Sequence, residues 1–244
     1  MNKKTHLIIL AFSLILTACA TYTTPGRGVN IQNLSAADNS ITDLMKVEPA
    51  ASFPARIAVA RVQSSGYRSM SNQCHGEGQF CVITTRDIES DTSFERLSKL
   101  PKVAGVAVMN RLLLPERLVS TFDLRKVAAT LKTDLLLIYT LDTAFNIEHT
   151  DIGPLQVISL GLFPSENAVV TATASAIIID VRTGFIYGTA ESTAKEEQRA
   201  TPWGSSEAVD DARKQAEKTA FNQLVPEIEK VWQNILNTHA RPNK

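Results

Sequence analysis

Cysteine and histidine are the side chains of this 244-residue sequence whose chemistry depends most directly on spacing. Cys74 and Cys81 enclose a short segment with two glycines, which suits a tight loop. If the chain enters an oxidising compartment, this pair predicts a disulfide. The alternative is a metal site that uses Cys74, His75 and Cys81. The sequence offers no second cluster of ligands to complete such a site, so the disulfide is the favoured interpretation.

Cys19 belongs to a different pattern. Two lysines and an almost wholly apolar run over 7–16 precede it, and that run is too short for a spanning helix of roughly 20 residues. The four residues Leu16-Thr17-Ala18-Cys19 resemble the bacterial lipobox. The resemblance implies a signal peptide over 1–18 and acylation, including palmitate, of Cys19 as the first residue of the mature chain. An ordinary signal peptide with a chance cysteine is the alternative.

The residue after this cysteine is Ala20, whereas enteric-type bacteria use Asp there to retain lipoproteins in the inner membrane. Resemblance to that sorting rule implies a chain anchored in the cell outer membrane and facing the periplasm. Several acyl chains would hold it stably, since each buried methylene contributes about 0.8 kcal/mol. Without its first two lysines the chain has 23 basic and 25 acidic residues. It lacks the basic excess of a nucleic-acid-binding protein, so no nucleic-acid partner is expected.

No group of residues has the pattern of an active site. A nucleophile–base pair needs a histidine or similar base near Ser, Cys or Thr. His75 lies beside the predicted disulfide, His149 in a predicted loop, and His239 in a predicted frayed tail over 239–244. Nucleophile-elbow, phosphate-loop and dinucleotide-binding glycine patterns are absent from the sequence. Two acidic groups are expected to be solvated or to favour a helix dipole: Glu196-Glu197 and Glu207/Asp210/Asp211. We therefore expect neither enzyme activity nor a cofactor.

The mature chain divides into two parts. Residues 19–52 are rich in small and polar residues without a sustained period, which predicts a flexible tether with a reach of roughly 30 Å. Residues 53–240 are predicted to form one periplasmic α/β domain. Its expected strands are 57–62, 81–85, 103–109 and 135–141. Helices are expected over 91–100 and from a Ser120/Asp123 capping box to Thr133.

A long hairpin over 168–196 is the strongest tertiary signal. Its turn is assigned to Asp180, Thr183 and Gly184, where glycine suits a left-handed position. Small residues share one face of each strand, which would let another element pack closely: Ala172, Ala174 and Ala176, then Gly188, Ala190, Ser192 and Ala194. The C-terminal helix from Ser206 is the expected partner, because its apolar residues recur every three or four positions through a bend at Pro226. The expected fold is thus α/β, a mixed sheet of about five strands packed on helices.

The connection over 148–167 is unusually apolar for a loop. One interpretation is that it folds back into the core. The other is that Leu160, Leu162 and Phe163 contact a partner protein or the membrane surface.

The stretch from Leu135 to Thr193 has a recognisable order: a buried strand, a connection, then Ser175-Ala-Ile-Ile-Ile-Asp-Val-Arg-Thr-Gly-Phe-Ile-Tyr-Gly-Thr-Ala190. It resembles the core of periplasmic α/β domains in bacterial lipoproteins, including the curli-secretion lipoprotein, the activators of penicillin-binding proteins and the N-terminal domain of the Tol–Pal β-propeller protein. A looser similarity links it to rhombotarget lipoproteins, although their Gly-Gly motif and spanning tail are missing.

This resemblance implies a non-enzymatic lipoprotein with a protein partner in the envelope, serving assembly, secretion or cell-wall regulation. The alternative is a ligand-binding or stress-sensing module, in which the cysteine loop and the 148–167 connection frame a pocket.

Overall fold

A mixed sheet of seven strands organises the described part of this computed structural model, which covers residues 28, 41–67, 73–149, 166–200 and 205–240. Its order is β2–β4–β1–β7–β8–β9, with β5 paired to β1 beside β4. The strands are β1 (Ala55–Ser64), β2 (Cys74–His75), β4 (Phe80–Ile83), β5 (Val103–Val108), β7 (Leu135–His149), β8 (Glu166–Asp180) and β9 (Ile186–Ala200). The α/β class and the mixed sheet are therefore as predicted, with additional short strands.

The lower part of the sheet is covered on both faces. Helix α3 (Asp91–Ser98) packs on one face with residues such as Ile57 and Val59, and α4 (Thr121–Thr130) packs on the other with Ala58 and Ala60. This alternation explains why β1 is buried along nearly its whole length. β5 and β7 run parallel to β1, while β4 runs antiparallel to it. We call this part of the molecule the base.

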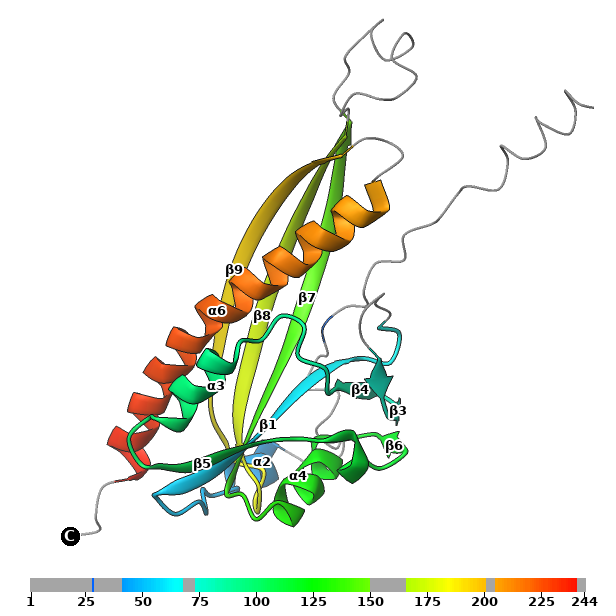
Figure 1. Cartoon of the computed structure of the whole chain (residues 1–244). Helices are drawn as coiled ribbons and strands as arrows, with labels where there is room; N and C mark the ends of the chain where they lie inside the picture. The colour runs from blue at the N-terminus through cyan, green and yellow to red at the C-terminus, as the bar shows by residue number, and fades with distance from the viewer. Residues whose placement is uncertain (1–27, 29–40, 68–72, 150–165, 201–204, 241–244) are drawn as a thin grey trace, which may run out of the picture.

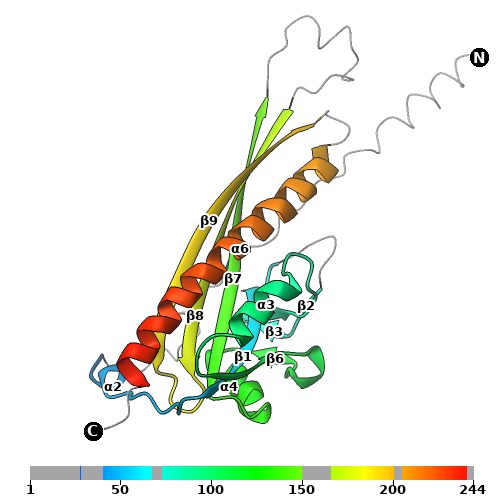
Figure 2. The ribbon, with the colours of Figure 1, turned by 60° about the vertical axis from the view of Figure 1, so that its left-hand side comes forward.

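The predicted hairpin has a third strand, because β7 continues to His149 rather than ending at Leu141. β7 pairs with β8 along all 15 residues of each strand. After Leu141 the strand alternates between covered and exposed side chains, so it loses the continuous apolar run by which the sequence identified it. Figures 1 and 2 show these strands leaving the base as a tapering projection. We call it the arm (140–149, 166–175 and 191–200).

Helix α6 (Ser205–His239) runs along the arm and down to the base, and it continues past Pro226 as one element. The prediction of a single helix through this proline is confirmed. His239 is the last residue of α6, and its ring lies 5.1 Å from that of Tyr187 and 5.8 Å from that of Phe185. The prediction of a frayed tail was therefore wrong for His239, because aromatic packing holds this residue, and 241–244 lie outside the described residues.

Smaller elements complete the base. They are α2 (Ile41–Met45), the 3-10 helix η3 (Arg111–Leu113), and a two-stranded sheet of β3 (Glu77–Gly78) and β6 (Arg117–Leu118). Helix α4 begins at the predicted capping box, where the carboxylate of Asp123 accepts hydrogen bonds from the backbone of Val119 and Ser120. None of the helices in the described ranges is both long enough and apolar enough to cross a membrane.

Candidate functional site

The strands of the arm pack closely on α6. Ala172, Ala174 and Ala194 are buried against a row of small α6 residues that includes Ala216 and Ala220. These short side chains let the helix approach the sheet closely. The small-residue face was predicted, and its partner is the predicted C-terminal helix.

At Gly188 the approach is close enough to require glycine. A Cβ atom at this position would lie 2.7 Å from Cγ1 of Val231. Such a separation is shorter than carbon–carbon contact distances of about 3.5–4.0 Å. Gly188 and Val231 therefore fix the distance between β9 and α6.

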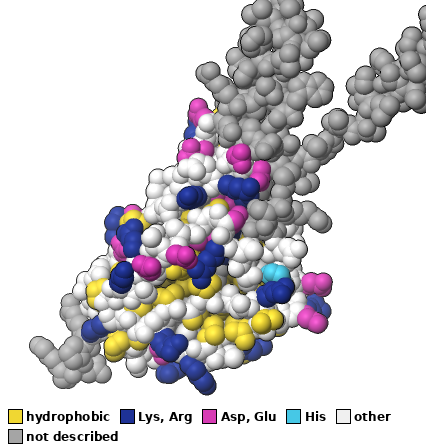
Figure 3. Space-filling model, viewed as in Figure 1, with side chains coloured by type: hydrophobic (Ala, Val, Ile, Leu, Met, Phe, Trp, Pro, Cys, Tyr) yellow, Lys and Arg dark blue, Asp and Glu magenta, His cyan; other side chains and the backbone are white. Residues whose placement is uncertain are grey.

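The other face of the arm is polar. Thr173 and Thr193 hydrogen-bond across the strands at 3.0 Å, and Ser175 donates a 2.9 Å bond to Glu191. Figure 3, seen from the side of α6, shows that charged and polar side chains also dominate the described surface on that side of the arm, whereas hydrophobic ones gather on the base.

The far end of the arm is where β7 ends, at His149, and where β8 begins, at Glu166. Leu160, Leu162 and Phe163, the predicted partner contacts, lie outside the described residues, as do the side chain of His149 and the lipidation site Cys19. In the sequence, Leu160, Leu162 and Phe163 belong to the connection between β7 and β8.

A buried charge cluster lies where the arm meets the base. Nη1 of Arg213 is 2.7 Å from Oε2 of Glu217, and Nη2 of Arg61 is 3.5 Å from the same oxygen. The hydroxyl of Thr143 donates a 2.9 Å bond to the other oxygen of Glu217. The cluster thus ties together α6, β1 and β7.

Arg61 extends the cluster towards the loop before α3. Its Nη1 lies 2.9 Å from Asp87 and 3.3 Å from Glu89, whose carboxylate also accepts a 2.7 Å bond from the hydroxyl of Tyr139. Burial, reinforced by Glu89, holds the pKa of Tyr139 well above its ordinary value. Tyr139 therefore remains a neutral hydrogen-bond donor.

The carboxylates of the cluster respond differently to their surroundings. Burial raises the pKa of Glu217 against the opposing pull of Arg213 and Arg61. Burial also opposes the charge on Asp210, but hydrogen bonds from Lys214 and Arg213 outweigh it and lower the pKa of that carboxyl. Since these acids are occupied by cations and hydroxyls, the arrangement is suited to holding elements together rather than to transferring protons.

Some polar atoms here have no hydrogen-bond partner within the described chain: Arg61 Nε, Arg213 Nη2, Gln63 Nε2 and the hydroxyl of Tyr67. Buried donors of this kind are usually satisfied by water. Sequence reasoning missed the cluster. Two signals were available, namely a lone Arg61 in an otherwise apolar strand and the four-residue spacing of Arg213 and Glu217 beside the apolar stripe of α6.

The cysteine loop contains the predicted disulfide. Cys74 and Cys81 are bonded, with their Cα atoms 5.4 Å apart, and they join β2 to β4. The alternative of a metal site at Cys74, His75 and Cys81 is contradicted, because both sulfur atoms are used in the bond. No group of metal-binding side chains occurs elsewhere in the ranges that the structure describes.

The turn between β8 and β9 contains Asp180, Thr183 and Gly184. The buried Oδ1 of Asp180 accepts hydrogen bonds from the backbone of Arg182 and Thr183. Oδ2 accepts from the backbone of Ala50 at 2.7 Å and from the hydroxyl of Tyr187 at 3.1 Å. This carboxylate therefore also fixes the segment that enters the domain, a contact that the turn pattern could not predict.

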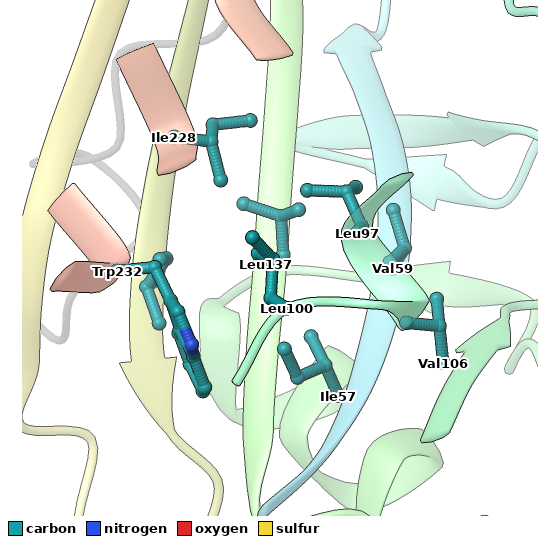
Figure 4. Close-up of a pocket in the computed structure, with 9 residues that line it drawn as sticks. Ile57, Val59, Leu97, Leu100, Val106, Leu137, Ile228 and Trp232 are labelled. Atoms are coloured by element: carbon teal, nitrogen blue, oxygen red, sulfur yellow. The ribbon is translucent and has the colours of Figure 1, made fainter. Parts of the chain in front are cut away.

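A small void lies inside the base. It is lined only by apolar side chains, among them Leu137, Ile228 and Trp232 (Figure 4). Its volume of about 10 Å³ leaves room for roughly one water molecule. It is a packing defect of the core and not a pocket for an organic ligand.

Comparison with known proteins gives only distant likenesses. No family model and no curated sequence match the chain. Among the solved structures that the chain resembles are three bacterial proteins. Protein XCC0632 from Xanthomonas campestris, of the DUF330 family, is 14% identical over 79% of this chain and 95% of its own, with a TM-score of 0.37. A neuraminyllactose-binding hemagglutinin homolog from Helicobacter pylori is 11% identical over 80% and 95%, with a TM-score of 0.40.

The third structure is lipoprotein GNA1162 from Neisseria meningitidis, 15% identical over 71% of this chain and 99% of its own, with a TM-score of 0.30. The identities and TM-scores are too low to assign this chain to a family.

Proposed function

We propose that this chain is a lipid-anchored, non-enzymatic protein of the bacterial outer membrane that binds a protein partner through the far end of its arm. The partner would serve envelope assembly, secretion or cell-wall regulation. The observation that carries this proposal is the arm itself, a stiff projection that ends in the apolar 150–165 connection.

The length of the arm supports a role in reaching a partner. β7 and β8 each contain 15 residues, and the 10 that lie in the arm correspond to about 33 Å beyond the base. Continuous pairing of the strands and cover by α6 stiffen this span. A loop at the end of a stiff support can meet a surface far from the base.

The buried charge cluster supports a mechanical rather than a catalytic role. Arg61 and Arg213 are buried and paired with carboxylates from two segments, the loop before α3 and helix α6. Breaking such pairs is costly, so α6 and the arm are expected to move together with the base. This stiffness suits a protein that presents a binding loop in a defined direction.

A photocrosslinking experiment tests the partner contact. A photoreactive residue replaces Leu160 in cells, and a matched control replaces Phe122 of α4, which is 55% exposed on the base. We expect discrete protein adducts from position 160 and none of the same size from position 122. Adducts to lipid alone would assign the loop to a membrane. Absence of any adduct, with the probe shielded from solvent, would overturn the proposed contact.

The anchor is tested separately. Cys19→Ser removes the sulfur atom that the lipobox resemblance assigns to acylation. We expect loss of fatty-acid labelling and release of the protein from the membrane fraction. Unchanged labelling and fractionation would refute the anchor without bearing on the arm.

A further inference from the structure

Helix α2 carries an apolar face that is largely exposed. Ile41, Leu44 and Met45 occupy positions one turn apart and therefore lie on the same side of the helix. Their side chains are 80%, 52% and 79% exposed, and no residue of α2 is buried. Three large apolar residues grouped in this way are unusual on a free surface.

This helix lies at one end of the sheet. Ala50, five residues after Met45, is fixed to Asp180, and Nη1 of Arg182 lies 3.4 Å from the carbonyl oxygen of Ala50. Figures 1 and 2 both place α2 beside the turn that joins β8 to β9. Ile186, the first residue of β9, is 52% exposed at that turn. The apolar residues of α2 and β9 are thus at the same end of the molecule.

Exposed cations surround this end. Arg56, Lys102 and Lys132 lie at the starts of β1, β5 and β7, which are parallel strands, and Arg182 lies in the turn before β9. The topology therefore brings all four to the same end of the sheet, where these strands begin.

The acidic groups at this end do not fully balance the cations. Asp43 pairs with Lys46 at 3.2 Å, and the other carboxylates are those of Glu48, Asp134 and Asp180. With Lys46 there are five cations against these four carboxylates. A small excess of positive charge therefore remains here.

We propose that this end of the molecule rests on the bilayer that holds the lipid anchor. The base surface consists of Ile41, Leu44, Met45, Arg56, Lys102, Lys132, Arg182 and Ile186. Exposed apolar residues with basic neighbours are the chemistry that binds a membrane interface, the former at the acyl boundary and the latter against anionic headgroups.

Chain length allows this end of the molecule to reach the bilayer. A Cβ atom at Gly28 would lie 3.3 Å from Oγ1 of Thr140, so the chain passes β7 at the start of the arm. The nine residues from the proposed acylated Cys19 to Gly28 extend to about 30 Å, whereas Thr140 lies about 17 Å along β7 from Leu135. The anchor can therefore lie level with the base surface, and the inference rests on the proposed anchor in this respect. It also deepens the proposed function, because the arm would then point away from the membrane with its partner loop outermost.

Vesicle flotation tests this surface without the anchor. The probe protein is the mature chain 19–244 with Cys19→Ser, and the vesicles are phosphatidylcholine with or without about 30 mol% phosphatidylglycerol. We expect binding to the anionic vesicles that weakens with salt. The triple change Ile41→Ser, Leu44→Ser and Met45→Ser should lower the partition coefficient by about tenfold or more. Because α2 buries no residue, this variant should keep the thermal midpoint of its parent.

A control is Leu112→Ser in η3, which removes a leucine that is 83% exposed, comparable to Ile41 and Met45, from another part of the base. This variant should bind vesicles like its parent. Equal binding to neutral and anionic vesicles, or a triple variant that binds like its parent, would overturn the proposal. Concentration-dependent self-association that the triple variant loses would also overturn it, by assigning the α2 face to a second copy. None of these outcomes affects the crosslinking result from position 160, so the two proposals fail separately.

Discussion

Arg61 on β1 and Glu217 on α6 are 156 residues apart in the chain, yet Nη2 of the arginine lies 3.5 Å from Oε2 of the glutamate, with both side chains buried. Arg213 approaches the same oxygen from one helical turn away. Two cations therefore share one carboxylate at the junction of base and arm. Ionic groups buried at such a junction favour one specific arrangement of the elements that they join.

Replacing Glu217 by glutamine should destabilise the protein strongly. Glutamine keeps the size of the side chain but leaves Arg213 and Arg61 without their shared negative charge in a buried place. Removing one partner of a buried ion pair costs about 3–5 kcal/mol. We expect a loss of this size in the free energy of unfolding, measured with urea.

Glu227→Gln on the same helix is the control. Glu227 pairs with Lys230 at 2.6 Å, but both side chains are largely accessible to solvent. A surface pair contributes less than about 1 kcal/mol. Equal losses for the two glutamine variants would show that the buried cluster does not fasten α6.

Acid should weaken the attachment of the segment around Ala50, because this attachment depends on the carboxylate of Asp180. Burial opposes the charge of this carboxylate, but hydrogen bonds from Ala50, Thr183, Arg182 and Tyr187 outweigh it and hold its pKa below the ordinary value. A carboxyl whose pKa is lowered in the native protein binds a proton more readily in the unfolded chain. Its stabilisation is therefore complete above about pH 4 and declines as the pH falls through the native pKa.

Asp180→Asn should remove this part of the pH dependence. The amide group of asparagine would place its own N–H donors opposite backbone N–H groups, which also donate. The thermal midpoint should therefore be lower at neutral pH, and it should change less with pH between about pH 6 and about pH 2. Asp91→Asn, at an exposed carboxyl on α3, should keep the parent profile. Parallel profiles for parent and Asp180→Asn would contradict the assignment.

Local patterns were enough to predict β8, β9 and α6 of the arm. The small residues of β8 and β9 and the three-to-four periodicity of α6 each depend on one segment packing on its neighbour. The pattern of β7 was read only as far as Leu141, because beyond it one face is exposed and the apolar run stops. The length of a strand depends on the strand that it pairs with, and β7 is long because β8 pairs with it as far as His149.

The charge cluster could not be assembled from sequence alone. Arg61, Glu89 and Glu217 come from a strand, a loop and a helix that meet only after the sheet has formed. Each charge is unremarkable in its own segment. Likewise, the Asp180 turn could be predicted from its own residues, whereas its bond to Ala50 depends on where the entry segment crosses the base.

Adding one methyl group at Gly188 should press α6 away from the arm. The Cβ atom of Gly188→Ala would lie 2.7 Å from Cγ1 of Val231, and overpacking of this kind costs about 1–3 kcal/mol. Val231→Ala removes the opposing methyl groups. The double variant should therefore lose less free energy of unfolding than the sum of the losses of the two single variants. Thr189→Ala, on the exposed side of β9, should change the free energy of unfolding little. Strict additivity of the Gly188 and Val231 changes would contradict a direct contact.

Reduction should weaken the edge of the base at the cysteine loop. The bond between Cys74 and Cys81 spans seven positions, and closing a loop of this size stabilises a protein by about 2.5 kcal/mol on chain-entropy grounds. In a Cys19→Ser background no thiol should react with a titrant before reduction, and two should react after reduction and unfolding. We expect the urea midpoint to fall with reductant, whereas the Cys74→Ala/Cys81→Ala variant should not respond to it. Free thiols in the oxidised protein would contradict the bond, and an unchanged midpoint would show that the antiparallel pairing of β2 with β4 persists without it.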